Sequence, residues 1–156
     1  MIYSNIEWSS LSLKLWRARE VIVMDQKKVV NFLSFWVANT VVLLLGSVVL
    51  KSNVVLGNDK LSAPLAAIIS GLILTGLIYL VPEVVKRSGY KIKDQNIWVA
   101  AYFIANVAII WIIKRLAIIT AFGISSIFWV LVVALVVTLV ELGVAKITGA
   151  MKLAKK

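Results

Sequence analysis

The sequence predicts an all-α integral membrane protein, a bundle of four transmembrane helices. Composition is the first observation that favours this class: 62% of the 156 residues are hydrophobic and 15% are charged, against about 45–50% and about 25% in soluble domains. The second is that the apolar residues fall in four long runs separated by short polar segments. A soluble domain of this size cannot bury so much apolar surface, so water-soluble and disordered proteins are both excluded.

Each of the four runs is long enough, or nearly long enough, to cross a bilayer as an α-helix, which takes about 20 residues. Many of their residues are β-branched, a type that is enriched in strands. In lipid, however, the backbone must satisfy its own hydrogen bonds, so long unbroken apolar runs form helices. The expected spans cover residues 29–50, 63–85, 97–113 and 123–144.

Local signals support the ends of these spans. Pro64 lies in the first turn of the second span, where its missing N–H costs little, whereas Pro82 near the other end is expected to kink or end that helix. Asp94 or Asn96 can cap the third span. We end the third span before Lys114, because a Lys or Arg carried into lipid would cost about 2.5–3.5 kcal/mol.

The distribution of basic residues predicts the orientation. Thirteen of the 17 Lys and Arg residues lie before the first span, between the second and third spans, or in the tail. Cytoplasmic segments carry the excess of Lys and Arg, so both termini are expected in the cytoplasm. We therefore assign residues 1–23 to a cytoplasmic segment, 24–146 to the transmembrane domain and 147–156 to a basic cytoplasmic tail, in a multi-pass protein of the cell membrane.

The segment 1–23 is not expected to cross the membrane. Residues 10–16 alternate between polar and apolar, a strand-like period, and no helical face emerges. Its basic and Trp residues could lie on an anionic membrane surface. Alternatively, for a bacterial or archaeal source, Met24 is the natural start, since codons for residues 18–21 could form a ribosome-binding stretch. The intact mass of the protein made from its own gene separates these alternatives.

The two halves of the chain are weakly similar, which predicts a tandem repeat of two helical hairpins in the same orientation. Each half has an Asn in its first span and a Gly in the turn that follows. The pairs are Asn39 with Gly57 and Asn106 with Gly123, so the spacings are 18 and 17 residues.

This repeated pattern, with an Ala-rich second span in each half, resembles the phage-holin superfamily IV type of small four-span membrane protein. The resemblance covers residues 29–144 and also rests on Phe128-Trp129 and Ala134. It implies a holin-like protein of a prokaryotic cell envelope that acts by self-association, by membrane permeabilisation or as an envelope component.

Five polar residues within the spans are the candidate functional residues: Asn39, Thr75, Asn106, Thr138 and Glu141. A buried amide in lipid must find a partner, so Asn39 and Asn106 are expected to bond across helices; lining a polar path is the alternative. Glu141 is expected to pair with Lys146 or to reach the interface, and a functional intramembrane acid is the alternative. Glu83 is expected to form an ordinary helix ion pair with Lys86 or Arg87.

One ridge of small residues recurs every four positions on the second span: Ala63, Ala67, Gly71 and Thr75. Small residues let helix backbones approach closely in membranes. We expect this ridge to meet another span of the same chain, with a second subunit as the alternative.

Several classes of function are disfavoured. The chain has neither Cys nor His, and it contains no phosphate-binding glycine loop and no paired carboxylates, so no enzyme, cofactor or metal site is expected. The basic residues lie between apolar runs, so nucleic acid is not an expected partner. The expected partners are the lipid bilayer and a homo-oligomer or another membrane protein.

Two alternatives to the holin-like function stay open. One is a structural subunit of a membrane complex, which should co-isolate with other chains. The other is a small transporter or channel built from the two-hairpin repeat, which needs a water-accessible polar site at the repeat interface. Ser70 would join the five polar residues in that site.

Overall fold

The computed structural model describes the backbone of residues 5–150 and the side chains of residues 26–150. The chain divides into two compact units, Met1–Leu33 and Ser34–Lys156. Helix α1, Asn5–Val49, begins in the first unit and ends in the second. The hydrophobic core and the buried polar residues belong to the second unit.

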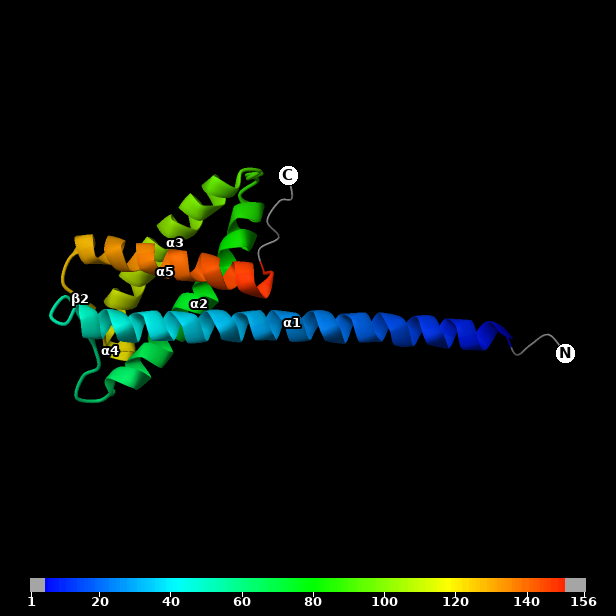
Figure 1. The fold of residues 1–156 in the computed structure, drawn as a ribbon, viewed down its shortest axis with the longest axis horizontal. Helices are drawn as coiled ribbons and strands as arrows, with labels where there is room; N and C mark the ends of the chain where they lie inside the picture. Colours follow the sequence, from blue (N-terminus) through cyan, green and yellow to red (C-terminus); the bar gives the residue numbers. More distant parts are fainter. Residues whose placement is uncertain (1–4, 151–156) are drawn as a thin grey trace. The chain divides into compact units, whose positions relative to one another are not determined.

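The elements that follow α1 are two strands and four helices (Figure 1): β1 (Val54–Leu56), α2 (Ala63–Arg87), α3 (Gln95–Arg115), α4 (Ala117–Thr120), β2 (Phe122–Ile124) and α5 (Ile127–Thr148). Four helical segments among the described residues are long and apolar enough to cross a membrane: Gln26–Val49, Ala63–Arg87, Gln95–Arg115 and Ile127–Thr148. The predicted all-α class with four spanning helices is confirmed.

The alternation over residues 10–16 suggests a strand, but these residues are part of helix α1. Extending a helix that already exists in the adjacent apolar run adds one hydrogen bond per residue, so a short period-2 pattern does not stop it. The side chains of residues 1–23, and with them the question of Met24 as a start, lie outside the described residues. So do residues 151–156 of the tail.

The start of the second span and the cap of the third are as expected. Pro64 lies in the first turn of α2, and the Asp94 carboxylate accepts a hydrogen bond of 2.9 Å from the Asn96 N–H at the start of α3. Pro82 does not end α2, which continues to Arg87.

The third and fourth spans differ from their predicted limits. Helix α3 continues through Lys114 and Arg115, and the Arg115 guanidinium lies 4.7 Å from the Trp111 ring, a cation–π contact that suits a helix end. Helix α5 begins at Ile127 rather than at residue 123. Phe122–Ile124, at the expected start of this span, are apolar but extended, because they pair with the strand Val54–Leu56.

That pair of strands is a feature that the sequence did not predict. Strands β1 and β2 are antiparallel, and Val55 lies opposite Gly123. The strands belong to corresponding connections of the two hairpins, and an antiparallel pair of corresponding segments is related by a local two-fold axis. Gly57 and Gly123, matched in the sequence repeat, are not equivalent, since Gly57 has φ +93° whereas Gly123 lies in the ladder.

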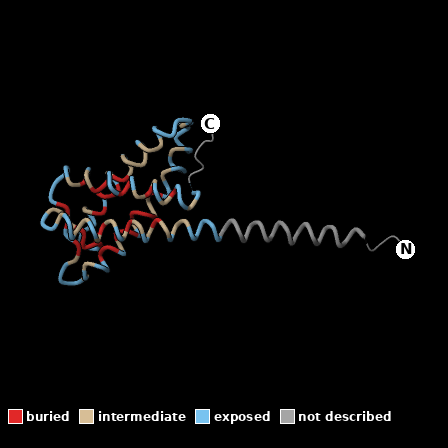
Figure 2. The backbone as a smooth tube through the Cα atoms, viewed as in Figure 1, coloured by how far each residue is buried: buried red, intermediate tan, exposed pale blue. Residues whose placement is uncertain are grey.

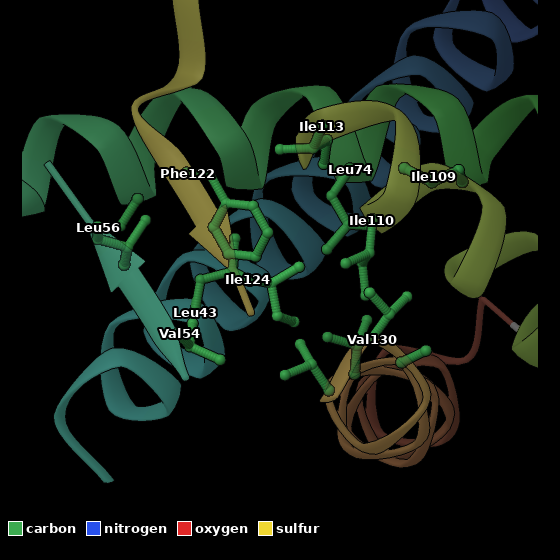
Figure 3. Packing of buried hydrophobic residues seen from close by; sticks show 14 of the residues in the cluster. Leu43, Val54, Leu56, Leu74, Ile109, Ile110, Ile113, Phe122, Ile124 and Val130 are labelled. Atoms are coloured by element: carbon green, nitrogen blue, oxygen red, sulfur yellow. The ribbon is translucent and has the colours of Figure 1, made fainter. Parts of the chain in front are cut away.

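The hydrophobic core lies under this small sheet (Figure 3). Alternate residues of both strands point inward, including Val54, Leu56 and Phe122, and Leu43 of α1 lies beside them. Side chains of α2, α3 and α5 complete the core, among them Leu74, Ile109, Ile110, Ile113 and Val130. Helix α3 packs against both α2 and α5.

The outward faces of the helices are apolar. Val37 on α1, Ile104 on α3 and Leu139 on α5 are 60%, 66% and 59% exposed. Figure 2 shows buried and exposed residues alternating along the helices of the second unit. Such surfaces suit contact with lipid chains, so the polar residues inside the bundle are the exception that needs explanation.

Candidate intramembrane polar site

Asn39 and Thr75 form the half of the site that belongs to the first hairpin. Asn39 lies on α1 and Thr75 on α2, and both side chains are completely buried. The Asn39 Nδ2 donates to Thr75 Oγ1 over 3.0 Å. Helix α2 approaches α1 closely at this level because Gly71, one turn before Thr75, lies against the backbone of Thr40.

Asn106 and Thr138 repeat this arrangement in the second hairpin. Asn106 lies on α3 and Thr138 on α5, and the Asn106 Nδ2 donates to Thr138 Oγ1 over 3.0 Å. The Thr138 hydroxyl itself donates to the Ala134 carbonyl over 2.7 Å, so its oxygen is free to accept from the amide. The two halves thus hold the same Asn–Thr pair across the same two helices.

Glu141 joins the two pairs. Its Oε1 accepts from the Asn39 Nδ2 over 2.9 Å and its Oε2 accepts from the Asn106 Nδ2 over 2.7 Å. The side chain is only 3% exposed. Both carboxylate oxygens accept, and all four amide hydrogens are used. We call these five residues, Asn39, Thr75, Asn106, Thr138 and Glu141, the Asn–Glu–Asn cluster.

The partners of Glu141 differ from the ordinary ones considered from sequence. It neither reaches the interface nor pairs with Lys146, which is exposed. Asn39 and Asn106 each lie near the middle of a spanning segment, so the carboxylate is held at mid-height of the bundle. Glu141 points into the bundle because it follows Thr138 by three residues and so lies on the same buried face of α5.

Two atoms of the cluster have no partner. Asn39 Oδ1 and Asn106 Oδ1 are buried and accept no hydrogen bond. A buried acceptor without a donor costs about 1–3 kcal/mol. These two oxygens occupy equivalent positions of the repeat, so each hairpin contains one amide oxygen that lacks a hydrogen-bond donor.

Position 78 in the first hairpin corresponds to Glu141 and was missed by the sequence analysis. Ile78 follows Thr75 by three residues, as Glu141 follows Thr138, and it is 2% exposed. The matched spacing was the signal that could have found it. The repeat therefore offers two equivalent buried positions, and only one of them holds an acid.

The other sequence candidates lie outside the cluster. Ala67, Gly71 and Thr75 of the small-residue ridge are buried and Ala63 is half-buried, and the ridge meets α1 of the same chain at Gly71. The Ser70 hydroxyl points to the Thr120 carbonyl, 3.5 Å away, rather than to the cluster.

Glu83 forms the ordinary ion pair expected of it. Its carboxylate lies 3.1 Å from the Arg87 guanidinium, and both side chains are exposed. Within the part of the chain that the structure describes, no three His, Cys, Asp or Glu side chains come together as a metal site of that kind. The Asn–Glu–Asn cluster is instead a set of one carboxylate, two amides and two hydroxyls.

Comparisons with protein-family models, with curated proteins and with solved structures found no match for this chain.

Proposed function

We propose that this chain is a small multi-pass membrane protein that moves a small cation across the bilayer, with Glu141 as the binding group. The four apolar spanning helices provide the membrane context. The single observation that carries the proposal is the buried Glu141 carboxylate, held by one Asn from each hairpin at 2.9 and 2.7 Å. An ionisable group inside a membrane bundle is a functional candidate by default.

A purely structural role accounts poorly for Glu141. Burying a carboxylate costs several kcal/mol, and replacing a whole buried charged cluster by apolar side chains of similar volume is often neutral or stabilising, whereas removing one member leaves the others without partners. Ile78 supports this point inside the same molecule, because the equivalent position of the first hairpin is filled by an apolar side chain. The fold therefore has a way to fill this position without a charge, and the acid needs another explanation.

The position of the cluster also favours transport. Transporters built from repeats hold their ions near the bilayer midplane, at the interface between the repeats. Glu141 lies between Asn39 of one hairpin and Asn106 of the other. A small movement of one hairpin relative to the other would change the partners of the carboxylate, which is the property that alternating access requires.

A second candidate is the holin-like function, in which several copies associate and form a lesion. Gly46, Gly76 and Gly143 favour it, because each faces open space on its helix, where another chain could approach closely. Against it, the polar residues of the cluster point inward and the outer faces are apolar. Copies that associate through these apolar faces would have no polar residues with which to line a lesion.

The test is flux into liposomes that contain the purified protein, followed with proton-, sodium- and potassium-sensitive probes and with dyes of graded size. We expect flux of one small cation that falls at least tenfold in Glu141→Gln. The matched control is Glu83→Gln, the same change at an exposed ion pair, which should retain wild-type flux. Passage of large dyes at high protein density would support the holin-like function instead. Tight vesicles under all conditions would contradict both.

We also propose that both termini face the cytoplasm of a prokaryotic cell, on the distribution of Lys and Arg. The connections that hold β1 and β2 would then face outward. Single cysteines test this cleanly because the chain has none of its own. An impermeant maleimide added to intact cells should label Asp59→Cys and should label Lys93→Cys only after lysis. The reverse pattern would contradict the orientation.

A further inference from the structure

The two unpartnered amide oxygens point to a ligand of the cluster. Asn39 Oδ1 and Asn106 Oδ1 are buried beside a carboxylate and receive no hydrogen bond. Within the described residues the only ion pair is that of Arg87 with Glu83, so the Glu141 charge has no basic partner there. The cluster therefore holds one negative charge and two spare acceptors, and it lacks a positive group.

Rotation of the two amides would turn the cluster into a set of oxygen ligands. The terminal torsion of Asn is broad and roughly two-fold, and rotation by 180° exchanges Oδ1 with Nδ2. Each Oδ1 would then face one Glu141 oxygen and one threonine hydroxyl. The six oxygens would be two from the carboxylate, two from the amides and two from Thr75 and Thr138, the ligand type that hard cations prefer.

We infer that the cluster binds one alkali-metal cation, coordinated by Glu141 together with the side-chain oxygens of Asn39 and Asn106. In the state described by the structure the amides donate to the carboxylate; in the cation-bound state they turn and present their oxygens. This inference rests on the proposed function and names its substrate class.

Charge favours a monovalent ion. One carboxylate balances one positive charge, whereas a divalent ion would leave an uncompensated charge in an apolar bundle, which is costly. A water molecule could donate to an amide oxygen but would leave the Glu141 charge unbalanced. Most other buried side chains of these helices, which include Leu43, Leu74 and Val137, are apolar, so an unbalanced charge among them is costly.

The number of acceptors favours a metal ion over a proton. A protonated Glu141 has one O–H and can donate it to Asn39 Oδ1 or to Asn106 Oδ1, but not to both. The other amide oxygen would stay without a partner. A metal ion accepts lone pairs from both amide oxygens at once, and the rotated Nδ2 groups then occupy the positions that the two oxygens hold in the structure. The titratable neighbour of Glu141 is Tyr102 of α3, and Tyr79 of α2 in turn interacts with Tyr102.

The inference is tested by thermal unfolding of the full chain in nanodiscs. Lithium, sodium, potassium or caesium chloride replaces choline chloride at constant ionic strength, and calcium chloride is a separate arm. Mass action predicts that one alkali ion raises Tm with the logarithm of its concentration above Kd, by about 3–6 °C at ten times its Kd. Glu141→Gln should lose this rise, and Glu83→Gln should keep it.

Matched substitutions separate binding from folding. Thr138 and Thr148 both donate to the carbonyl four residues earlier in α5, but only Thr138 accepts from Asn106. Thr138→Val should weaken the apparent affinity for the ion at least fivefold, and Thr148→Val should leave it unchanged. Circular dichroism before heating identifies variants that have kept their helices, and only these are compared.

The outcomes distinguish this inference from the proposed function. A Tm independent of alkali ions in folded wild-type protein, or a rise retained in folded Glu141→Gln, would overturn the cation site. Glu141-dependent proton flux with no alkali effect on Tm would keep transport and reject the metal ion. A Tm rise that depends on Glu141, together with tight vesicles, would keep the site and reject transport.

Discussion

Removal of Glu141 should reveal how much the cluster contributes to stability. In Glu141→Leu the two hydrogen bonds from Asn39 and Asn106 are lost and both amide groups stay buried. Hydrogen bonds between membrane helices average about 0.6 kcal/mol and reach about 1.7 kcal/mol, so the loss of two predicts a decrease of about 1–3 kcal/mol in the free energy of unfolding.

Glu141→Gln should behave differently, because a glutamine can still bond to both amides. Its Oε1 can accept from one Asn, and its Nε2 can donate to the Oδ1 of the other, once that amide has rotated. That oxygen has no partner in the structure. The change also removes a buried charge, so we expect a free energy of unfolding within about 1 kcal/mol of wild type.

The assay is unfolding in mixed micelles by the choline salt of dodecyl sulfate, followed by Trp fluorescence, without alkali ions. Glu83→Leu at the exposed ion pair controls for the loss of a carboxylate and should change stability by less than about 0.5 kcal/mol. The reasoning is refuted if Glu141→Leu is as stable as wild type. It is also refuted if Glu141→Gln is destabilised as much as Glu141→Leu.

Two further predictions concern packing and the strand register. A Cβ at Gly71 would lie 3.0 Å from the Thr40 backbone nitrogen, so Gly71→Ala should destabilise the protein by about 1–3 kcal/mol in the same assay. Gly76→Ala, on the same helix but facing open space, should not, and equal effects would exclude the close approach of α1 and α2. Val54 and Ile124 lie opposite each other in the two strands, within disulfide reach. The double cysteine variant should therefore form an intramolecular disulfide on mild oxidation, which a mobility shift on gels detects. A chain that stays reduced would contradict the register.

The membership of the cluster could be predicted from sequence because lipid offers polar side chains no partner. Asn39, Thr75, Asn106, Thr138 and Glu141 are polar residues well inside the spans, and hydrogen bonds from one another can meet their needs. The two-hairpin pattern also indicated that equivalent residues of the two halves would lie in corresponding places.

The pairing within the cluster could not be predicted in the same way. Whether Glu141 reaches Lys146 or the two amides depends on how α5 is rotated and tilted. Packing against the other helices sets this orientation, and no local sequence pattern indicates it. Ser70 shows the same limit, since it is buried on α2 but more than one turn from Thr75, and it lies near Thr120 instead.

The ends of the spans were harder to predict than the spans themselves. A three-residue strand such as β2 is too short for a periodic signal, and its apolar residues read as the start of the next helix. Only its pairing with β1, across a long stretch of sequence, makes it extended. Pro82 is a similar case, because its local preference to end a helix is overridden in α2.

The central claim is that one carboxylate joins the two hairpins inside the membrane. Solid-state NMR of the labelled protein in lipid bilayers measures this directly, through correlations between the side-chain carboxyl carbon of Glu141 and the side-chain amide nitrogens. We predict two cross-peaks, one lost in Asn39→Leu and the other lost in Asn106→Leu. Neither should change in Asn96→Leu, on the exposed first turn of α3. Absence of both cross-peaks, or a single cross-peak that survives both substitutions, would contradict the claim.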